Sequence, residues 1–194
     1  MTHTVEELME RAWRWRRESF DQSLGARLAR LQAANQTLQE AVQIAYDDGD
    51  IRNLAQALHL LANLENDVER FDRAEFLWQE SIELCRVLAD DMMLAHKVRH
   101  LGDLCRKLDR LDEAQSHYAE ALDLYRNVEI TEPTEILNYA NLLIRIAELV
   151  EELGRPVAAN RYWQEARHKF DGIGLTEGAE HCDAQLRRLA ISSS

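Results

Sequence analysis

The sequence has few of the residues that interrupt helices. Its 194 residues include only 7 glycines and 2 prolines. Alanine, leucine, glutamate, arginine and glutamine are common instead, and these residues have high helix propensity. No run resembles a strand bounded by turn residues. This composition excludes most β-rich folds and predicts an all-α protein.

Cysteine is also scarce, with Cys85, Cys105 and Cys182 scattered along the chain. An odd number of cysteines without paired spacing argues against a disulfide framework and against a zinc site of the paired-cysteine type. We expect all three to be small buried residues on helices.

The chain has no long uninterrupted apolar run. Residues 1–17 carry three glutamates and four arginines, which is typical of neither a signal peptide nor a membrane span. We therefore expect a cytoplasmic protein without a membrane partner. The net charge is −12 and no strongly basic segment stands out, so we also expect no nucleic-acid partner.

One pattern occurs four times, in segments 34–41, 74–81, 114–121 and 159–166. Each has a small residue, a bulky residue four positions later, and another small residue three positions after that. The first three copies are 40 residues apart and the last is 45 residues further on. Small residues at this spacing let helices approach closely, which is typical of stacked two-helix repeats. The bulky residues Trp78, Tyr118 and Trp163 are expected to pack within the repeats.

A second pattern precedes the small and bulky residues of the later copies. It is clearest in Val98, Leu101, Gly102 and Cys105, and it returns around Leu58, Leu61 and Ala62 and around Leu143, Ile146 and Ala147. The two patterns together resemble the tetratricopeptide repeat. These repeats exceed the usual length of about 34 residues, so longer helices are expected. Elongated repeats of this kind resemble those of kinesin light chains and of bacterial regulators that sense a peptide or ligand.

The resemblance implies an α-α superhelix of about four helix pairs in one domain, residues 1–194. We expect a divergent N-terminal cap or repeat over 1–50, repeats over 51–90, 91–130 and 134–173, and a capping helix over 175–190. At the N-terminus the repeat spacing puts Glu18, Asp21, Gln22 and Gly25 at positions that are apolar in the other first helices. A separate amphipathic helix that includes Trp13 and Trp15 is expected to dock on the first repeat.

In the tetratricopeptide repeat family, the face of the first helix opposite its apolar stripe lines a concave groove. The resemblance therefore implies a groove that changes from neutral to basic to acidic, suited to an extended peptide of matching charge. The candidate binding residues are His59, Asn63, Asn66, His96, Arg99, Asp103, Arg106, Lys107, Asn141 and Glu148. The alternative is that these are ordinary solvated helix faces, with Asp103 paired to Arg106 or Lys107.

Two of these candidates, His59 and His96, are histidines. His96 and His100 lie four residues apart, a spacing at which one helix can present two metal ligands, and His59 is a conceivable third. No HExxH sequence occurs, and no carboxylate is placed to support such a site. We expect no metal and no cofactor.

No motif for chemistry stands out, since the chain has no glycine-rich phosphate loop, nucleophile motif or distinctive carboxylate pair. We therefore expect no enzymatic activity. The leading hypothesis is a protein-binding or peptide-binding adaptor or sensor module with an unknown partner. The alternative is a homo-oligomeric scaffold, such as a homodimer, that self-associates through its terminal helices, by Trp13 and Trp15 or by Leu186 and Leu189.

Overall fold

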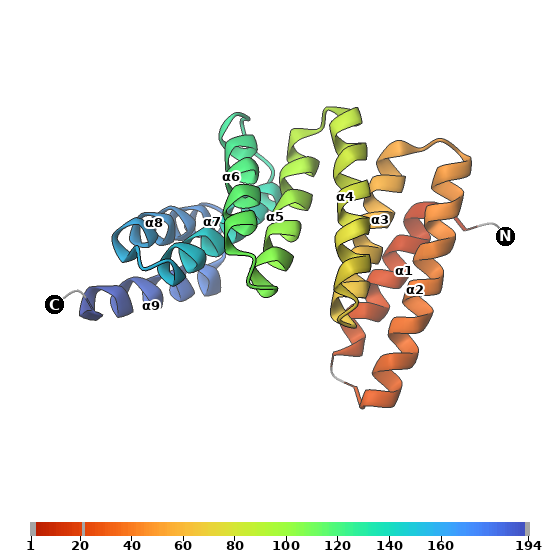
Figure 1. The fold of residues 1–194 in the computed structure, drawn as a ribbon, viewed down its shortest axis with the longest axis horizontal. Coiled ribbons are helices and arrows are strands. Elements are labelled where there is room, and N and C mark those ends of the chain that lie inside the picture. The colour runs from red at the N-terminus through yellow and green to blue at the C-terminus, as the bar shows by residue number, and fades with distance from the viewer. Residues whose placement is uncertain (1–2, 21, 193–194) are drawn as a thin grey trace. The chain divides into compact units, whose positions relative to one another are not determined.

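The computed structural model describes residues 3–20 and 22–192. Within these ranges the chain forms nine helices and no strand, so the all-α prediction is confirmed (Figure 1). The helices are α1 (Val5–Ser19), α2 (Leu24–Asp47), α3 (Ile51–Asp67), α4 (Phe71–Leu88), α5 (Asp91–Lys107), α6 (Leu111–Arg126), α7 (Pro133–Glu152), α8 (Pro156–Gly172) and α9 (Thr176–Ser192). None of them is long and apolar enough to cross a membrane.

Local sequence signals explain where several helices begin. Thr4 caps α1 by accepting a hydrogen bond from the Glu7 backbone, and the Glu7 side chain accepts one from the Thr4 backbone. Asp50 caps α3. Proline, whose missing N–H costs nothing in the first turn, starts α7 and α8.

Left-handed residues close many of the helices. Gly49, Gly154 and Gly174 have φ values of 69°, 71° and 71° after α2, α7 and α8. The same conformation occurs without glycine after α3, α4 and α5, at Glu69 (61°), Ala89 (51°) and Asp109 (61°). A residue with a β-carbon pays a conformational penalty there that glycine avoids.

The chain divides into two compact units, residues 1–90 and 91–194. In the N-terminal unit, α1 packs on α2 and α3 packs on α4, and α3 also packs on α1 and α2. Leu8 and Ala12 of α1, Leu38 of α2 and Trp78 of α4 are buried. Helix α1 therefore packs on α2 as the first helix of a pair, rather than as a separate helix docked on the first repeat.

The position of the first helix corrects the sequence interpretation. Repeat spacing placed that helix around residues 18–25, but α1 ends at Ser19 and α2 begins at Leu24. Asp21 lies outside the described residues. The reason is that α2 is 24 residues long and begins at Leu24, within the segment that the repeat spacing assigned to the first helix. Helix α1, which pairs with α2, therefore lies nearer the N-terminus than the repeat spacing indicated.

In the C-terminal unit, α5 pairs with α6, α7 pairs with α8, and α9 packs on α8. Tyr118 and Trp163 are buried at the centres of their pairs, as predicted. Gly102 lies against Tyr118, where an added β-carbon would be 2.7 Å from the ring. The three cysteines are also buried, as expected. The single domain over 1–194 stays a prediction.

Candidate functional site

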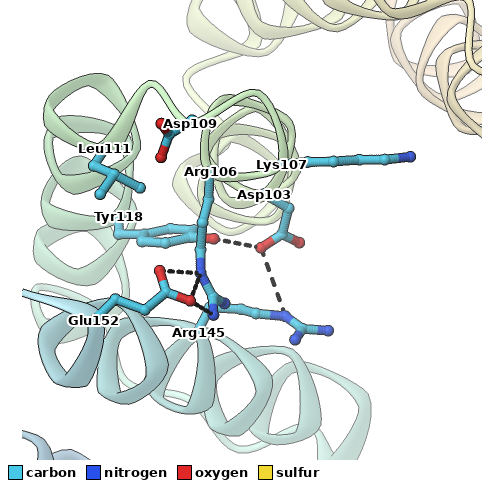
Figure 2. Close-up of a pocket in the computed structure, with 8 residues that line it drawn as sticks. All are labelled: Asp103, Arg106, Lys107, Asp109, Leu111, Tyr118, Arg145 and Glu152. Atoms are coloured by element: carbon cyan, nitrogen blue, oxygen red, sulfur yellow. Dashed lines mark hydrogen bonds and ion pairs between the residues drawn. The ribbon is translucent and has the colours of Figure 1, made fainter.

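A pocket of about 560 Å³ opens between α5, α6 and α7 of the C-terminal unit (Figure 2). Its lining is mostly charged and consists of Asp103, Arg106, Lys107, Asp109, Leu111, Tyr118, Arg145 and Glu152. Arg106 and Arg145 converge from two helices, whereas Lys107 extends away from them. A lining this polar suits a charged or hydrogen-bonding ligand.

Asp103 is the acceptor at one wall of the pocket. The Tyr118 hydroxyl donates to its Oδ1 at 2.7 Å, and Arg99 Nη1 donates to its Oδ2 at 2.8 Å. Arg145 Nε lies 3.6 Å from Oδ1. Burial, together with the adjacent Asp103 carboxylate, raises the pKa of the Tyr118 hydroxyl, so this group remains a hydrogen-bond donor. These contacts hold the carboxylate in one orientation.

Arg106 reaches from α5 to two carboxylates on α7. Its Nε lies 3.0 Å from Glu152 Oε2, and its Nη1 donates to Glu148 Oε2 at 2.5 Å. Hydrogen bonding to Glu152 raises the pKa of Arg106, and the same contact lowers the pKa of Glu152. Arg145 Nη1 shares the Glu148 carboxylate at 3.1 Å. The guanidinium is therefore fixed across the space between the two helices.

A second pocket, of about 280 Å³, adjoins the first. It is lined by Arg106, Glu148, Glu151, Glu152, Trp163, Gln185 and Arg188. Trp163 Nε1 donates to Glu151 Oε1 at 2.6 Å, and Arg188 of α9 pairs with the other oxygen of Glu151. Arg106 and Glu152 line both pockets, so their ion pair forms the partition between them. A ligand that filled both pockets would lie across this pair.

Residues 53–127, which span most of α3 to α6, match the sequence model of the tetratricopeptide repeat family. This segment consists of tetratricopeptide repeats. No curated protein matches the chain.

Solved tetratricopeptide-like structures share the fold at low sequence identity. The apo form of RapI aligns with 87% of this chain and 56% of its own, with 12% identity and a TM-score of 0.71. NprR in complex with its cognate peptide NprX aligns with 97% of this chain and 49% of its own (16%, 0.66). The repeats of a Podosopora anserina kinesin light chain align with 100% of this chain and 99% of theirs (14%, 0.59). The chain thus spans about half the length of RapI and NprR.

The structure brings several predicted residues of the tetratricopeptide groove together. Asp103, Arg106 and Lys107 line the first pocket, and Glu148 lines the second. Arg99 is 7% exposed and acts on the site through Asp103.

Two other predicted residues of the C-terminal unit lie outside both pockets. Asn141 is half-buried on α7. His96 contacts His100, with ring centroids 4.8 Å apart. Burial, with Arg99 and Lys97 nearby, lowers the pKa of His96 to about 3, so this ring is neutral at physiological pH.

The predicted residues of the N-terminal unit are mostly internal. His59 Nδ1 accepts a hydrogen bond from Trp78 Nε1 at 3.2 Å, and Asn63 Nδ2 donates to the His59 carbonyl at 3.0 Å. His59 and Asn63 are 2% and 5% exposed, and Asn66 is half-buried. Helix α3 contacts α1, α2 and α4, which leaves little of its surface exposed. A role for these three residues in binding stays a prediction.

The predicted binding residues leave out several residues that line the two pockets, among them Tyr118, Arg145 and Glu152. Tyr118 was interpreted as a packing residue, and it is buried as expected, but its hydroxyl reaches the pocket. The sequence held a signal for this role, because Tyr118 occupies the repeat position at which two other copies have tryptophan. The spacing of Arg145, Glu148 and Glu152 along one face of α7 was a second signal.

Proposed function

We propose that this chain is a non-catalytic binding module that holds an extended peptide, or an extended segment of a partner protein, across the two pockets of its C-terminal unit. The observation that carries the proposal is the adjoining arrangement of the pockets on either side of the Arg106–Glu152 pair. Polar groups of both signs face the two spaces, which matches a ligand with a polar backbone and charged side chains.

The fold supports this function. One tetratricopeptide-like structure of similar fold, NprR, was solved with its cognate peptide bound. In the chain itself, Asp103 and Arg106 are held by two or more contacts each before any ligand arrives. Groups fixed in this way lose little conformational entropy on binding. The pockets are therefore organised for recognition.

A selection experiment tests the proposal. A phage-displayed library of random linear peptides is selected on the intact chain, and the enriched peptides are measured by fluorescence anisotropy. The double variant Arg106→Gln, Glu152→Gln removes the partition without changing net charge. We expect it to weaken the enriched peptides by about tenfold or more, as is usual when an interface charge-assisted contact is lost.

The chain offers a matched control. Arg167 Nε pairs with Asp183 Oδ1 at 2.6 Å within the same unit, and neither residue lines these pockets. The variant Arg167→Gln, Asp183→Asn should bind the peptides as the original chain does. Equal binding by all three proteins, with helicity intact, would reject the pockets as the binding surface. A dimeric mass in the absence of peptide would favour the self-associating scaffold instead.

A further inference from the structure

The second pocket already contains a guanidinium group of the chain itself. Arg188 of α9 lines this pocket, where its Nε donates to Gln185 Oε1 at 2.9 Å and its Nη2 donates to Glu151 Oε2. The chain therefore shows directly which chemical group the second pocket accommodates.

Glu151 is the fixed member of this ion pair. Its side chain is 16% exposed, and its Oε1 accepts a hydrogen bond from Trp163 Nε1 at 2.6 Å. Trp163 is itself 1% exposed, so packing holds the indole in place. A single neutral donor does not balance the charge of a carboxylate in an enclosed site. Glu151 therefore requires a cation at its other oxygen.

Arg188 is the exchangeable member of the pair. Its side chain is 53% exposed, whereas the neighbouring Leu189 is 5% exposed and anchors this part of α9. The guanidinium can therefore leave the pocket while the helix stays where it is. An ion pair with a solvent-exposed partner contributes little to stability, so exchanging that partner for another cation costs little.

The other charges of the second pocket are balanced without Arg188. Arg106 and Arg145 pair with the two other carboxylates that line the pocket. Arg188 is the one cation among the described contacts of Glu151. When Arg188 withdraws, two guanidinium groups face three carboxylates, and the uncompensated charge lies on Glu151. A cationic group of a ligand is complementary to the pocket in that state.

The two acceptors in the pocket favour arginine over lysine. Arg188 uses one nitrogen atom for Glu151 and another for Gln185. A planar guanidinium presents several N–H donors at fixed positions, whereas an ammonium is a compact point charge without this geometry. Both acceptors become available together when Arg188 withdraws.

We propose that the second pocket takes an arginine side chain of the bound peptide, which replaces Arg188 on Glu151 and Gln185. This inference rests on the proposed function and names one residue type that its ligand contains. Arg188 then acts as an internal competitor. A peptide that lacks arginine gives up this contact, so the pocket selects among peptides.

A small probe tests the arginine subsite apart from any peptide. N-acetyl-arginine amide is titrated into the intact chain, and NMR follows the Nε1–H signal of Trp163, which reports on Glu151. We expect a saturable shift with this probe and none with N-acetyl-citrulline amide, which has a similar shape but no charge. N-acetyl-lysine amide should need a higher concentration to produce the same shift.

Three substitutions then separate competition from a general effect of charge. Arg188→Gln should bind the arginine probe about tenfold more tightly, as expected if the internal competitor fills the pocket about nine-tenths of the time. Glu151→Gln should abolish the shift. Arg187 is an exposed neighbour that lines none of the described pockets, so Arg187→Gln is the charge-matched control and should bind as the original chain does. Circular dichroism verifies that all four proteins are equally helical.

The peptide selection gives a second test. Enriched peptides should share an arginine, and replacing it by citrulline should weaken binding to the original chain by about tenfold. The same replacement should change little when the chain carries Glu151→Gln, because the carboxylate that the arginine contacts is already absent.

Several outcomes would overturn the inference. These are no saturable shift with Arg188→Gln, equal shifts with the arginine and citrulline probes, and equal tightening by Arg188→Gln and Arg187→Gln. Enriched peptides that Arg106→Gln, Glu152→Gln weakens but Glu151→Gln does not would reject the arginine subsite and leave the proposed function standing. Saturable binding of the probe without any enriched peptide would support the subsite and reject the proposed function.

Discussion

Gly102 lies directly against the ring of Tyr118, so that a β-carbon at position 102 would be 2.7 Å from Cε1 and 2.8 Å from Cδ1. Separations this short do not occur between real side chains, so any larger residue must displace the ring. Tyr118 is 1% exposed and its hydroxyl bonds Asp103. The glycine therefore keeps both the helix pair and the wall of the pocket in place.

We expect Gly102→Ala to lower the free energy of unfolding by about 1–3 kcal/mol, because overpacking outweighs the higher helix propensity of alanine. Urea unfolding followed by circular dichroism measures the change. Gly25 in α2 has no atom within 4 Å of its would-be β-carbon. Gly25→Ala should thus be neutral or slightly stabilising, and a loss equal to that of Gly102→Ala would contradict the packing argument.

The left-handed residues that close helices predict opposite effects of exchanging alanine and glycine. Ala89 and Gly154 have φ values of 51° and 71°. Ala89→Gly should stabilise the chain by roughly 1 kcal/mol, and Gly154→Ala should destabilise it by a similar amount, because only the β-carbon pays the left-handed penalty. Thermal unfolding of the two variants gives the signs. Shifts of the same sign would show that these turns relax in solution.

The contact between Arg106 and Glu152 should contribute less to stability in acid. The pKa of Glu152 lies below the ordinary value of 4.5 because Arg106 donates to the carboxylate. A depressed folded pKa adds stability above pH 4.5 that is lost as the pH falls through the folded value. Arg106→Gln should therefore reduce the free energy of unfolding at neutral pH, by a difference that shrinks on acidification.

Urea unfolding at a series of pH values, from neutrality to below 4.5, checks this dependence. In a chain that already carries Glu152→Gln, Arg106→Gln should lower the free energy of unfolding by less, since either substitution removes the same contact. Because both side chains are partly exposed, added salt should also weaken the effect. A difference between the original chain and Arg106→Gln that is constant with pH would contradict the assignment.

Much of this fold followed from sequence periodicity. The spacing of Ala74, Ala114 and Ala159 predicted the three helix pairs α3/α4, α5/α6 and α7/α8. The position of the first helix was wrong, because repeat spacing cannot tell where a lengthened helix gains its extra turns. The added length lies at the start of α2.

The candidate site was predictable only in part. Helical spacing placed Asp103, Arg106 and Lys107 on one face of α5, but it could not show that Arg106 reaches Glu152, which is 46 residues away. Such a contact depends on the register between neighbouring helix pairs. The sequence analysis also assumed that α3 buries one face and exposes the other. This was a poor description, because α3 packs against three other helices.

The three buried cysteines have a practical consequence. Burial raises the pKa of the Cys182 thiol to about 11, so little nucleophilic thiolate forms at neutral pH. Cys85 and Cys105 are likewise enclosed by helices. A cysteine introduced at an exposed position such as Gln79 should therefore be the preferred site of maleimide labelling in the folded chain, and the natural cysteines can remain in place.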